Sequence, residues 1–304
     1  MTKKSVLPFG TYKTFVKEAF IGFPKLWWRI GLVNIITLLS IVVISGLLVG
    51  IAFLIFRDTL EGIIANLQFG GKIMPQIWVL GGFALVWLLG VIVLSIVGKI
   101  SIWLTLKNHS GKKSKNPFSI YFVHSWKYFG RYILTGLKII WYIMWPIILV
   151  LSIGGIAARF VPGFPILAGF IVAGGLFLWR IVNVLLVAPT LVHFDVSSSA
   201  KAFDAGLNMV KKNWWKVFLF FVGFFALLNI TRGLFLVPDF VMNYGWNMNF
   251  EIWADYTSRY PQTYQPTWIL VLDGLFSFFI LTPLIVTFLY SLMLHLSKAK
   301  KIKP

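Results

Sequence analysis

Two basic side chains lie inside long apolar runs, where they could bind an anion. Lys138 and Arg180 fall within residues 132–158 and 166–192, and neither run contains an acidic residue. A charge near the centre of a bilayer costs at least about 2.5 kcal/mol unless it is paired or reaches water. Asn183 lies about one helical turn from Arg180, and a guanidinium can pair with two phosphate oxygens. We therefore expect Arg180, with Lys138 and Asn183 assisting, to bind an anion or a lipid head group.

Both basic residues also have a simpler structural interpretation. Lys138 could extend its long aliphatic stem toward the head groups. Arg180 could donate to carbonyls that Pro146 or Pro189 leave without an amide partner, because proline has no N–H to give to its helix. In that case the arginine would hold the bundle together without binding a ligand.

A second pair of charges lies in the two apolar runs nearest the C-terminus. Arg232 lies near the C-terminal end of the run 214–237 and Asp273 near the N-terminal end of the run 268–296, so both fall toward the same side of the membrane. Consecutive helices of a hairpin usually touch, so an intramembrane ion pair between these two residues is the expected arrangement. The alternative is that Asp273 is a proton or cation site.

Other patterns that would indicate catalysis are missing from the sequence. The four histidines, at 109, 124, 193 and 295, stand on separate segments without the spacing of a metalloprotease helix. There is no cysteine and no phosphate-binding loop motif. We expect no metal, no cofactor and no catalytic residue, so the protein is predicted not to be an enzyme.

Six apolar runs dominate the chain of 304 residues. About 20 helical residues cross a hydrocarbon core of roughly 30 Å, and a single spanning segment must satisfy its own backbone groups as a helix. We therefore predict an all-α membrane protein with six transmembrane helices. They cover residues 30–56, 76–98, 132–158, 166–192, 214–237 and 268–296.

The lysines and arginines predict the orientation. With six spans, only Arg57, Lys72, Arg159 and Arg259 lie on the side away from the termini, and most of the 28 cations lie on the other side. By the positive-inside rule both termini are cytoplasmic, in the cell (inner) membrane. The net charge of +19 is explained by these flanking cations and by anionic lipids, so no nucleic-acid partner is expected.

A weak internal repeat divides the single membrane domain, residues 1–304, into three units. Each unit combines a cytoplasmic amphipathic helix with a two-span hairpin, at about 10–106, 117–193 and 199–298. The pairs Trp27–Trp28 and Trp214–Trp215 correspond to each other and are expected to anchor the chain at the head groups. The helix before the fifth span should lie in the interface with its apolar face down and with Lys201, Asp204, Asn208 and Lys211 largely on the opposite side. The alternative is an ordinary helical lead-in to a span.

The segment from Val187 to Phe203, followed by 210–215, carries a proline near the end of a span, a short acidic turn, a small-residue helix and a Lys-Asn-Trp-Trp entry. This order resembles the membrane domain attached to some bacterial glycerophosphodiester phosphodiesterases and its stand-alone relatives. The resemblance implies a polytopic membrane domain and supplies no catalytic residues. Besides the six spans, the sequence leaves no room for a phosphodiesterase barrel of about 250 residues, so that activity is not expected.

Two classes of function remain open at this stage. The first is a non-enzymatic membrane protein that binds lipid head groups, anionic lipids among them, or partner proteins, including a second copy of itself. The second is a transporter of small solutes or lipids, which the repeat and the glycine pairs 154–155 and 174–175 would suit. A membrane-embedded enzyme is a distant third.

Overall fold

The computed structural model describes residues 23–56, 75–110, 116–161, 163–211, 213–215, 217–223, 226 and 282–300. All regular secondary structure in these ranges is helical. The chain divides into two compact units, Trp28–Ile133 and Met1–Trp27 with Leu134–Pro304. Each unit is described by itself below.

Four of the described helical segments are long and apolar enough to cross a membrane. They are Trp28–Ile55, Trp78–His109, Trp126–Ala157 and Phe164–His193. The first four predicted spans fall on these segments. Of the two remaining predicted spans, only parts lie within the described residues: a helical stretch over 214–223 with position 216 left out, and the helix α13 (Thr282–Lys300).

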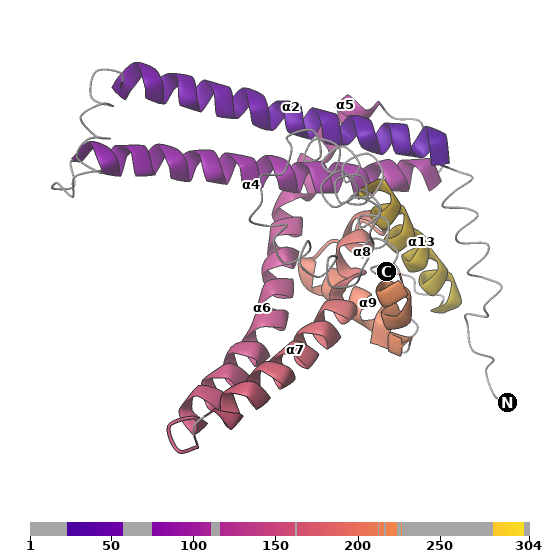
Figure 1. Ribbon diagram of the computed structural model, residues 1–304. Helices are drawn as coiled ribbons and strands as arrows, with labels where there is room; N and C mark the ends of the chain where they lie inside the picture. Colours follow the sequence, from indigo (N-terminus) through magenta and orange to yellow (C-terminus); the bar gives the residue numbers. More distant parts are fainter. Residues whose placement is uncertain are drawn as a thin grey trace, which may run out of the picture. The chain divides into compact units, whose positions relative to one another are not determined.

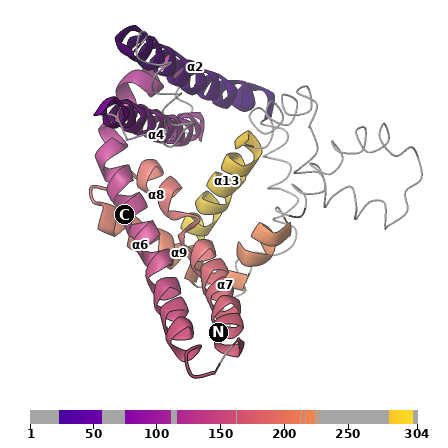
Figure 2. The same ribbon diagram turned by 60° about the vertical axis from the view of Figure 1, so that its left-hand side comes forward.

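The unit Trp28–Ile133 is built around two long helices, α2 (Phe23–Phe56) and α4 (Pro75–Ser110). They lie side by side in both views (Figures 1 and 2). Gly98 allows the close approach, because a Cβ atom there would lie 2.5 Å from Thr37 Oγ1. The π-helix η1 (Ile120–His124) packs against α4, and the short helix α5 (Pro117–Ser119) packs against η1. A buried 2.6 Å hydrogen bond joins the Ser101 and Ser125 hydroxyls there.

Burial within α2 changes sharply along its length. Ile30, Val33 and Ile36 are buried, whereas nearly all the large apolar side chains from Leu38 to Ile55 are exposed. The exposed stretch is about 26 Å long at ~1.5 Å per residue, close to the thickness of a hydrocarbon core. Its surface is therefore of the kind that lipid tails would cover.

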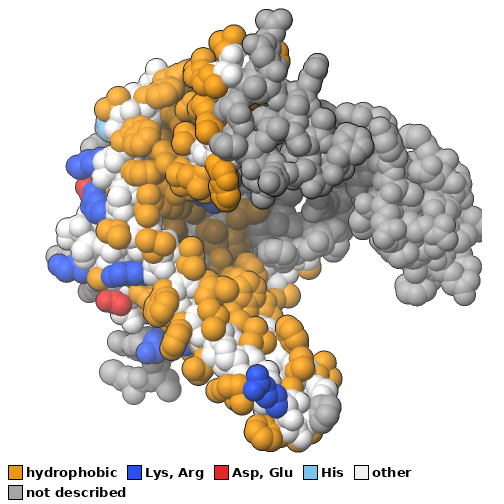
Figure 3. All heavy atoms as spheres, turned by 90° about the vertical axis from the view of Figure 1, so that its left-hand side faces the viewer, with side chains coloured by type: hydrophobic (Ala, Val, Ile, Leu, Met, Phe, Trp, Pro, Cys, Tyr) orange, Lys and Arg blue, Asp and Glu red, His pale blue; other side chains and the backbone are white. Residues whose placement is uncertain are grey.

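The other unit centres on a hairpin of α7 (Phe164–Val184) and the part of α6 (Trp126–Ala157) from Leu134 onward. Gly154 permits tight packing next to the turn, since a Cβ there would lie 3.1 Å from the Pro165 carbonyl oxygen, while neighbouring Gly155 faces open space. The two helices diverge away from that turn in both views (Figures 1 and 2). Apolar side chains cover much of the visible face of the hairpin (Figure 3).

Three further helices pack together at the open end of this hairpin. α8 (Val187–His193) and α9 (Ser199–Lys211) form the most extensive contact, and α13 touches both. α8 buries Leu191 and Val192, and α9 buries Ala202 and Met209. The amphipathic helix expected before the fifth span therefore forms. Its apolar face, however, packs on protein, where we expected lipid.

The contact between α8 and α9 depends on Gly206. A Cβ atom at this position would lie 2.6 Å from the Cα atom of Val187, a backbone atom at the start of α8. Only glycine lets the two backbones approach this closely without displacement. The position of α9, and of every side chain on its outer face, follows from this contact.

Candidate binding pocket

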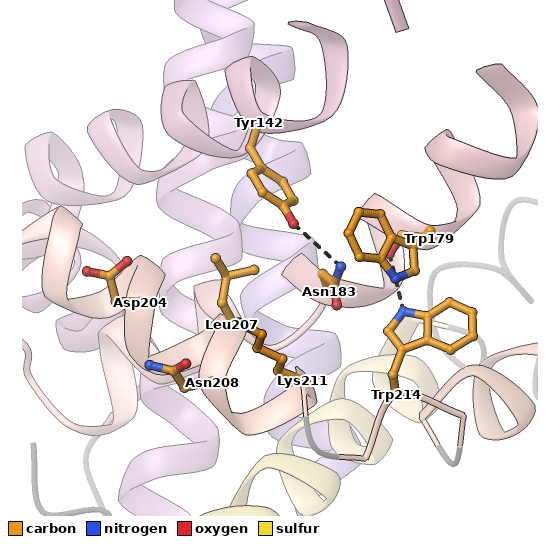
Figure 4. Close-up of a pocket in the computed structure, with 8 residues that line it drawn as sticks. All are labelled: Tyr142, Trp179, Asn183, Asp204, Leu207, Asn208, Lys211 and Trp214. Atoms are coloured by element: carbon orange, nitrogen blue, oxygen red, sulfur yellow. Dashed lines mark hydrogen bonds between the residues drawn. The ribbon is translucent and has the colours of Figure 1, made fainter. Parts of the chain in front are cut away.

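A pocket of about 450 Å³ opens where α6 and α7 diverge (Figure 4). Its walls come from four parts of the same unit: α6, α7, α9 and the start of the helical stretch that follows α9. The lining residues are Tyr142, Trp179, Asn183, Asp204, Leu207, Asn208, Lys211 and Trp214. This volume lies within the range of small-molecule sites.

The periodicity of α9 explains which of its side chains reach the pocket. Residues three or four apart share one face of a helix, so Asp204, Asn208 and Lys211 line up on the face opposite the buried Ala202 and Met209. All three polar side chains are exposed. Packing of the apolar face on α8 thus turns a positive and a negative charge toward the same pocket.

The depth of the pocket follows from the length of α7. Phe164 begins this helix, and Asn183 lies about 28 Å further along it at ~1.5 Å per residue. That distance is close to the full thickness of a hydrocarbon core. If the turn of the hairpin lies at one membrane surface, the pocket lies at the level of the opposite head groups.

Tyr142 connects the two walls of the hairpin. Asn183, which is buried at 6% exposure, donates from Nδ2 to the Tyr142 hydroxyl oxygen at 3.4 Å. The Tyr142 ring also contacts the Phe203 ring of α9 edge to face, with centroids 5.5 Å apart. One aromatic side chain therefore touches both α7 and α9.

Arg180 contacts the backbone carbonyl and the ring of the same tyrosine. Its Nη1 donates to the Tyr142 carbonyl oxygen at 3.3 Å, and its guanidinium lies 4.0 Å from the centre of the Tyr142 ring. Pro146 has no N–H to offer this carbonyl, which is four residues before it in α6. Arg180 therefore makes the hydrogen bond to a carbonyl near Pro146 that was given as the alternative to anion binding.

The arginine nevertheless keeps one donor without a partner. Its Nε is buried and makes no hydrogen bond in the structure. Arg180 does not line the pocket, although Asn183 and Trp179 beside it do. Binding of an anion by Arg180 itself stays a prediction.

The position of Arg180 within its helix differs from the sequence estimate. The sequence places it near the middle of a continuous run, 166–192, but α7 ends at Val184, one turn beyond the arginine. The run continues as α8, whose apolar side chains are buried in protein. Apolar composition alone does not distinguish a helix in lipid from one in a protein core.

The expected trio of Arg180, Lys138 and Asn183 is brought together only in part. Arg180 and Asn183 meet around Tyr142, as described above. Lys138 lies one turn before Tyr142 on α6 and is exposed. It does not line the pocket, and within the described residues no hydrogen bond joins it to the other two.

Tryptophans form the side of the pocket away from α9. Trp214 Nε1 donates to the Trp179 carbonyl oxygen at 3.4 Å, and the Trp214 ring stacks on Phe218. Trp28 and Trp215 are 63% and 69% exposed, respectively. Their anchoring at the head groups stays a prediction. The side chain of Trp27 lies outside the described residues.

Arg232 and Asp273, the expected intramembrane pair, both lie outside the described residues. Within the described ranges, no group of three histidine, aspartate or glutamate side chains is placed to hold a metal ion.

No family model, curated protein or solved structure matches this chain. The resemblance to the membrane domain of glycerophosphodiester phosphodiesterases therefore stays a prediction. Inferences about function rest on the geometry of the chain itself.

Sequence reasoning missed most of the pocket. It assigned Asp204, Asn208 and Lys211 to a polar face opposite the apolar face of an interfacial helix, and it did not single out Trp179. The spacings of four and three residues between Asp204, Asn208 and Lys211 do predict that the three polar side chains share a face. Together they can bind a polar group, because an ammonium and amide N–H groups donate hydrogen bonds while a carboxylate accepts them.

Proposed function

We propose that this protein is a non-enzymatic membrane protein that binds the phosphate of lipid head groups in the pocket between α6, α7 and α9. The observation that carries the proposal is the combination of Lys211, Asn183 and Asn208 in one pocket of about 450 Å³. A lysine ammonium is a common phosphate ligand. The amide groups add hydrogen bonds to the remaining oxygens.

The surroundings of the pocket suit a lipid. Trp179 and Trp214 line it, and tryptophan is enriched at the level of head groups. The exposed side chain of Val172 lies two turns before Trp179 on the same face of α7, between the pocket and the hairpin turn. Acyl chains could lie along this surface while the phosphate occupies the pocket.

We further propose the architecture and orientation expected from the sequence. Six spans would form three units, each an amphipathic helix with a hairpin, with both termini cytoplasmic in the cell (inner) membrane. The four long apolar helices support this arrangement. The α9 helix, followed directly by a helical stretch over 214–223, supports the third unit.

Orientation can be tested with single cysteines, because the natural chain contains none. We expect an impermeant thiol reagent to label Thr263→Cys but not Ser114→Cys in intact cells, since cations concentrate on the side of residue 114. Permeabilised cells, in which both should react, are the control. The reverse labelling pattern would invert the proposed topology.

Lipid binding can be tested at Lys211. We expect Lys211→Gln to weaken retention of phosphate-bearing lipid about fivefold, since one cation near the head groups contributes about 1 kcal/mol. Native mass spectrometry of the purified chain measures the bound lipid. Lys201→Gln is the matched control, because Lys201 is also exposed on α9 but does not line the pocket. Equal retention by the two variants would reject the pocket as the lipid site.

A transporter of small solutes or lipids is the alternative function. A pocket of this volume could hold a small solute, and the diverging α6 and α7 could close around it. Transport predicts protein-dependent flux into proteoliposomes that Lys211→Gln abolishes, whereas a binding protein gives no flux. Partner proteins or a second copy of the chain could instead cover the exposed apolar helices.

A further inference from the structure

We infer that the pocket selects a zwitterionic head group in which a phosphate is joined to a primary ammonium, with Lys211 binding the phosphate and Asp204 binding the ammonium. The inference rests on the proposed function, because it names which phosphate-bearing head group the same pocket prefers. Phosphoethanolamine is the simplest chemical example. It occurs as a lipid head group and as a free solute.

The first argument is the balance of charge. Among the lining residues, Asp204 carries a negative charge and Lys211 a positive one. They lie on one face of α9, about 10 Å apart along the helix axis. Within the described part of the chain, Asp204 and Lys211 do not form an ion pair with each other, and neither forms one with a third residue. A ligand with both charges would pair with each residue, whereas a purely anionic ligand would meet repulsion from Asp204.

The second argument is the position of the neutral polar groups. Asn208 lies between Asp204 and Lys211 on α9, and Asn183 enters from α7 (Figure 4). Each amide can donate to a phosphate oxygen and accept from an ammonium. Asn183 is held by its bond to the Tyr142 hydroxyl, so its amide is oriented before a ligand binds.

The third argument concerns the aromatic rings, and it disfavours a quaternary ammonium. Proteins bind choline-type cations on open aromatic faces. Here Arg180 lies 4.0 Å from the centre of the Tyr142 ring and 5.2 Å from that of Trp179. Trp214 stacks on Phe218. The guanidinium would repel a second cation from two of the three rings, which leaves the Asp204 carboxylate as the cation partner. A carboxylate favours an ammonium that has N–H donors.

The test compares head-group preference in the full-length chain. Native mass spectrometry measures retention of phosphatidylethanolamine, phosphatidylglycerol and phosphatidylcholine supplied in equal amounts. We expect phosphatidylethanolamine to be retained best by the unmodified chain. Asp204→Asn should lower its preference over phosphatidylglycerol about threefold, as expected for one exposed ion pair. Asp204→Glu, which keeps the charge, should keep the preference.

Lys211→Gln separates this inference from the proposed function. It should weaken retention of all three lipids, since all three carry a phosphate. If Lys211→Gln lowers lipid retention but Asp204→Asn leaves the preference unchanged, the pocket binds phosphate and the ammonium assignment is overturned. If neither variant changes retention, the proposed function fails as well.

A competition arm distinguishes the two sources of the head group. Soluble phosphoethanolamine is added to protein loaded with phosphatidylethanolamine. Displacement of the lipid by the free compound, lost in Asp204→Asn, would support a site that also accepts the solute. Retention of the lipid at saturating compound would assign the site to the bilayer. Displacement that is equal in unmodified and Asp204→Asn protein would count against the ammonium contact.

Discussion

Replacing Gly206 with alanine is expected to lower the free energy of unfolding by about 1–3 kcal/mol, the usual cost of overpacking a well-packed core. The new methyl group would lie 2.6 Å from both the Cα and Cγ2 atoms of Val187. The Cα atom cannot move without shifting the start of α8. The contact between α8 and α9 would therefore open, and with it the wall of the pocket that α9 provides.

The matched control for this prediction is Gly174→Ala. Gly174 lies in α7 of the same unit, and a Cβ atom there has nothing within 4 Å. Alanine has a higher helix propensity than glycine by up to about 1 kcal/mol, so this variant should be neutral or stabilised. Thermal and denaturant unfolding in detergent measure both. Destabilisation of similar size in the two variants would mean that the close contact of Gly206 does not determine stability.

Replacing Arg180 with methionine is expected to cost about 1–3 kcal/mol of unfolding free energy, because the part-buried Tyr142 carbonyl would lose its donor. Most of that cost should disappear when Pro146 is replaced by alanine. The new N–H at position 146 can donate to the Tyr142 carbonyl within α6. The double-mutant cycle should therefore show a coupling nearly as large as the cost of Arg180→Met, between two residues that do not bond each other. Unfolding in detergent measures all four proteins.

Lys138→Met is the control for the cycle, since Lys138 is an exposed cation on α6. Its effect should be the same in the unmodified chain and in the Pro146→Ala variant. An Arg180→Met cost that is unchanged by Pro146→Ala would show that the carbonyl bond is not the source of the loss. Loss of co-purifying anionic lipid in Arg180→Gln would then favour the anion-binding role first expected for this residue.

The helical class and the membrane character of the chain could be predicted from the sequence. Runs such as 30–56 contain almost only apolar residues, and in lipid such a segment has to be a helix because its backbone has no other partners. The 199–211 helix could also be predicted, since its apolar and polar residues alternate with the period of a helix. These are local properties, and each depends on one segment alone.

The sequence also identified a set of residues that could carry function, and the structure reassigned several of them. Arg180 stood out because a charge in an apolar run is rare and costly. Its observed partner is a backbone carbonyl 38 residues away, and every residue has a carbonyl. Composition marks a residue that needs a partner. It does not identify that partner.

Only the tertiary structure decided what each face of α9 contacts. The apolar stripe of an amphipathic helix is compatible with a lipid surface or with a protein core, since both exclude water. Gly206 settles the choice here by allowing α9 to pack on the backbone of α8. Asp204 and Lys211 then face Tyr142 and Asn183 across a pocket. No periodicity within α9 encodes that arrangement, because it depends on how α9 packs against other helices.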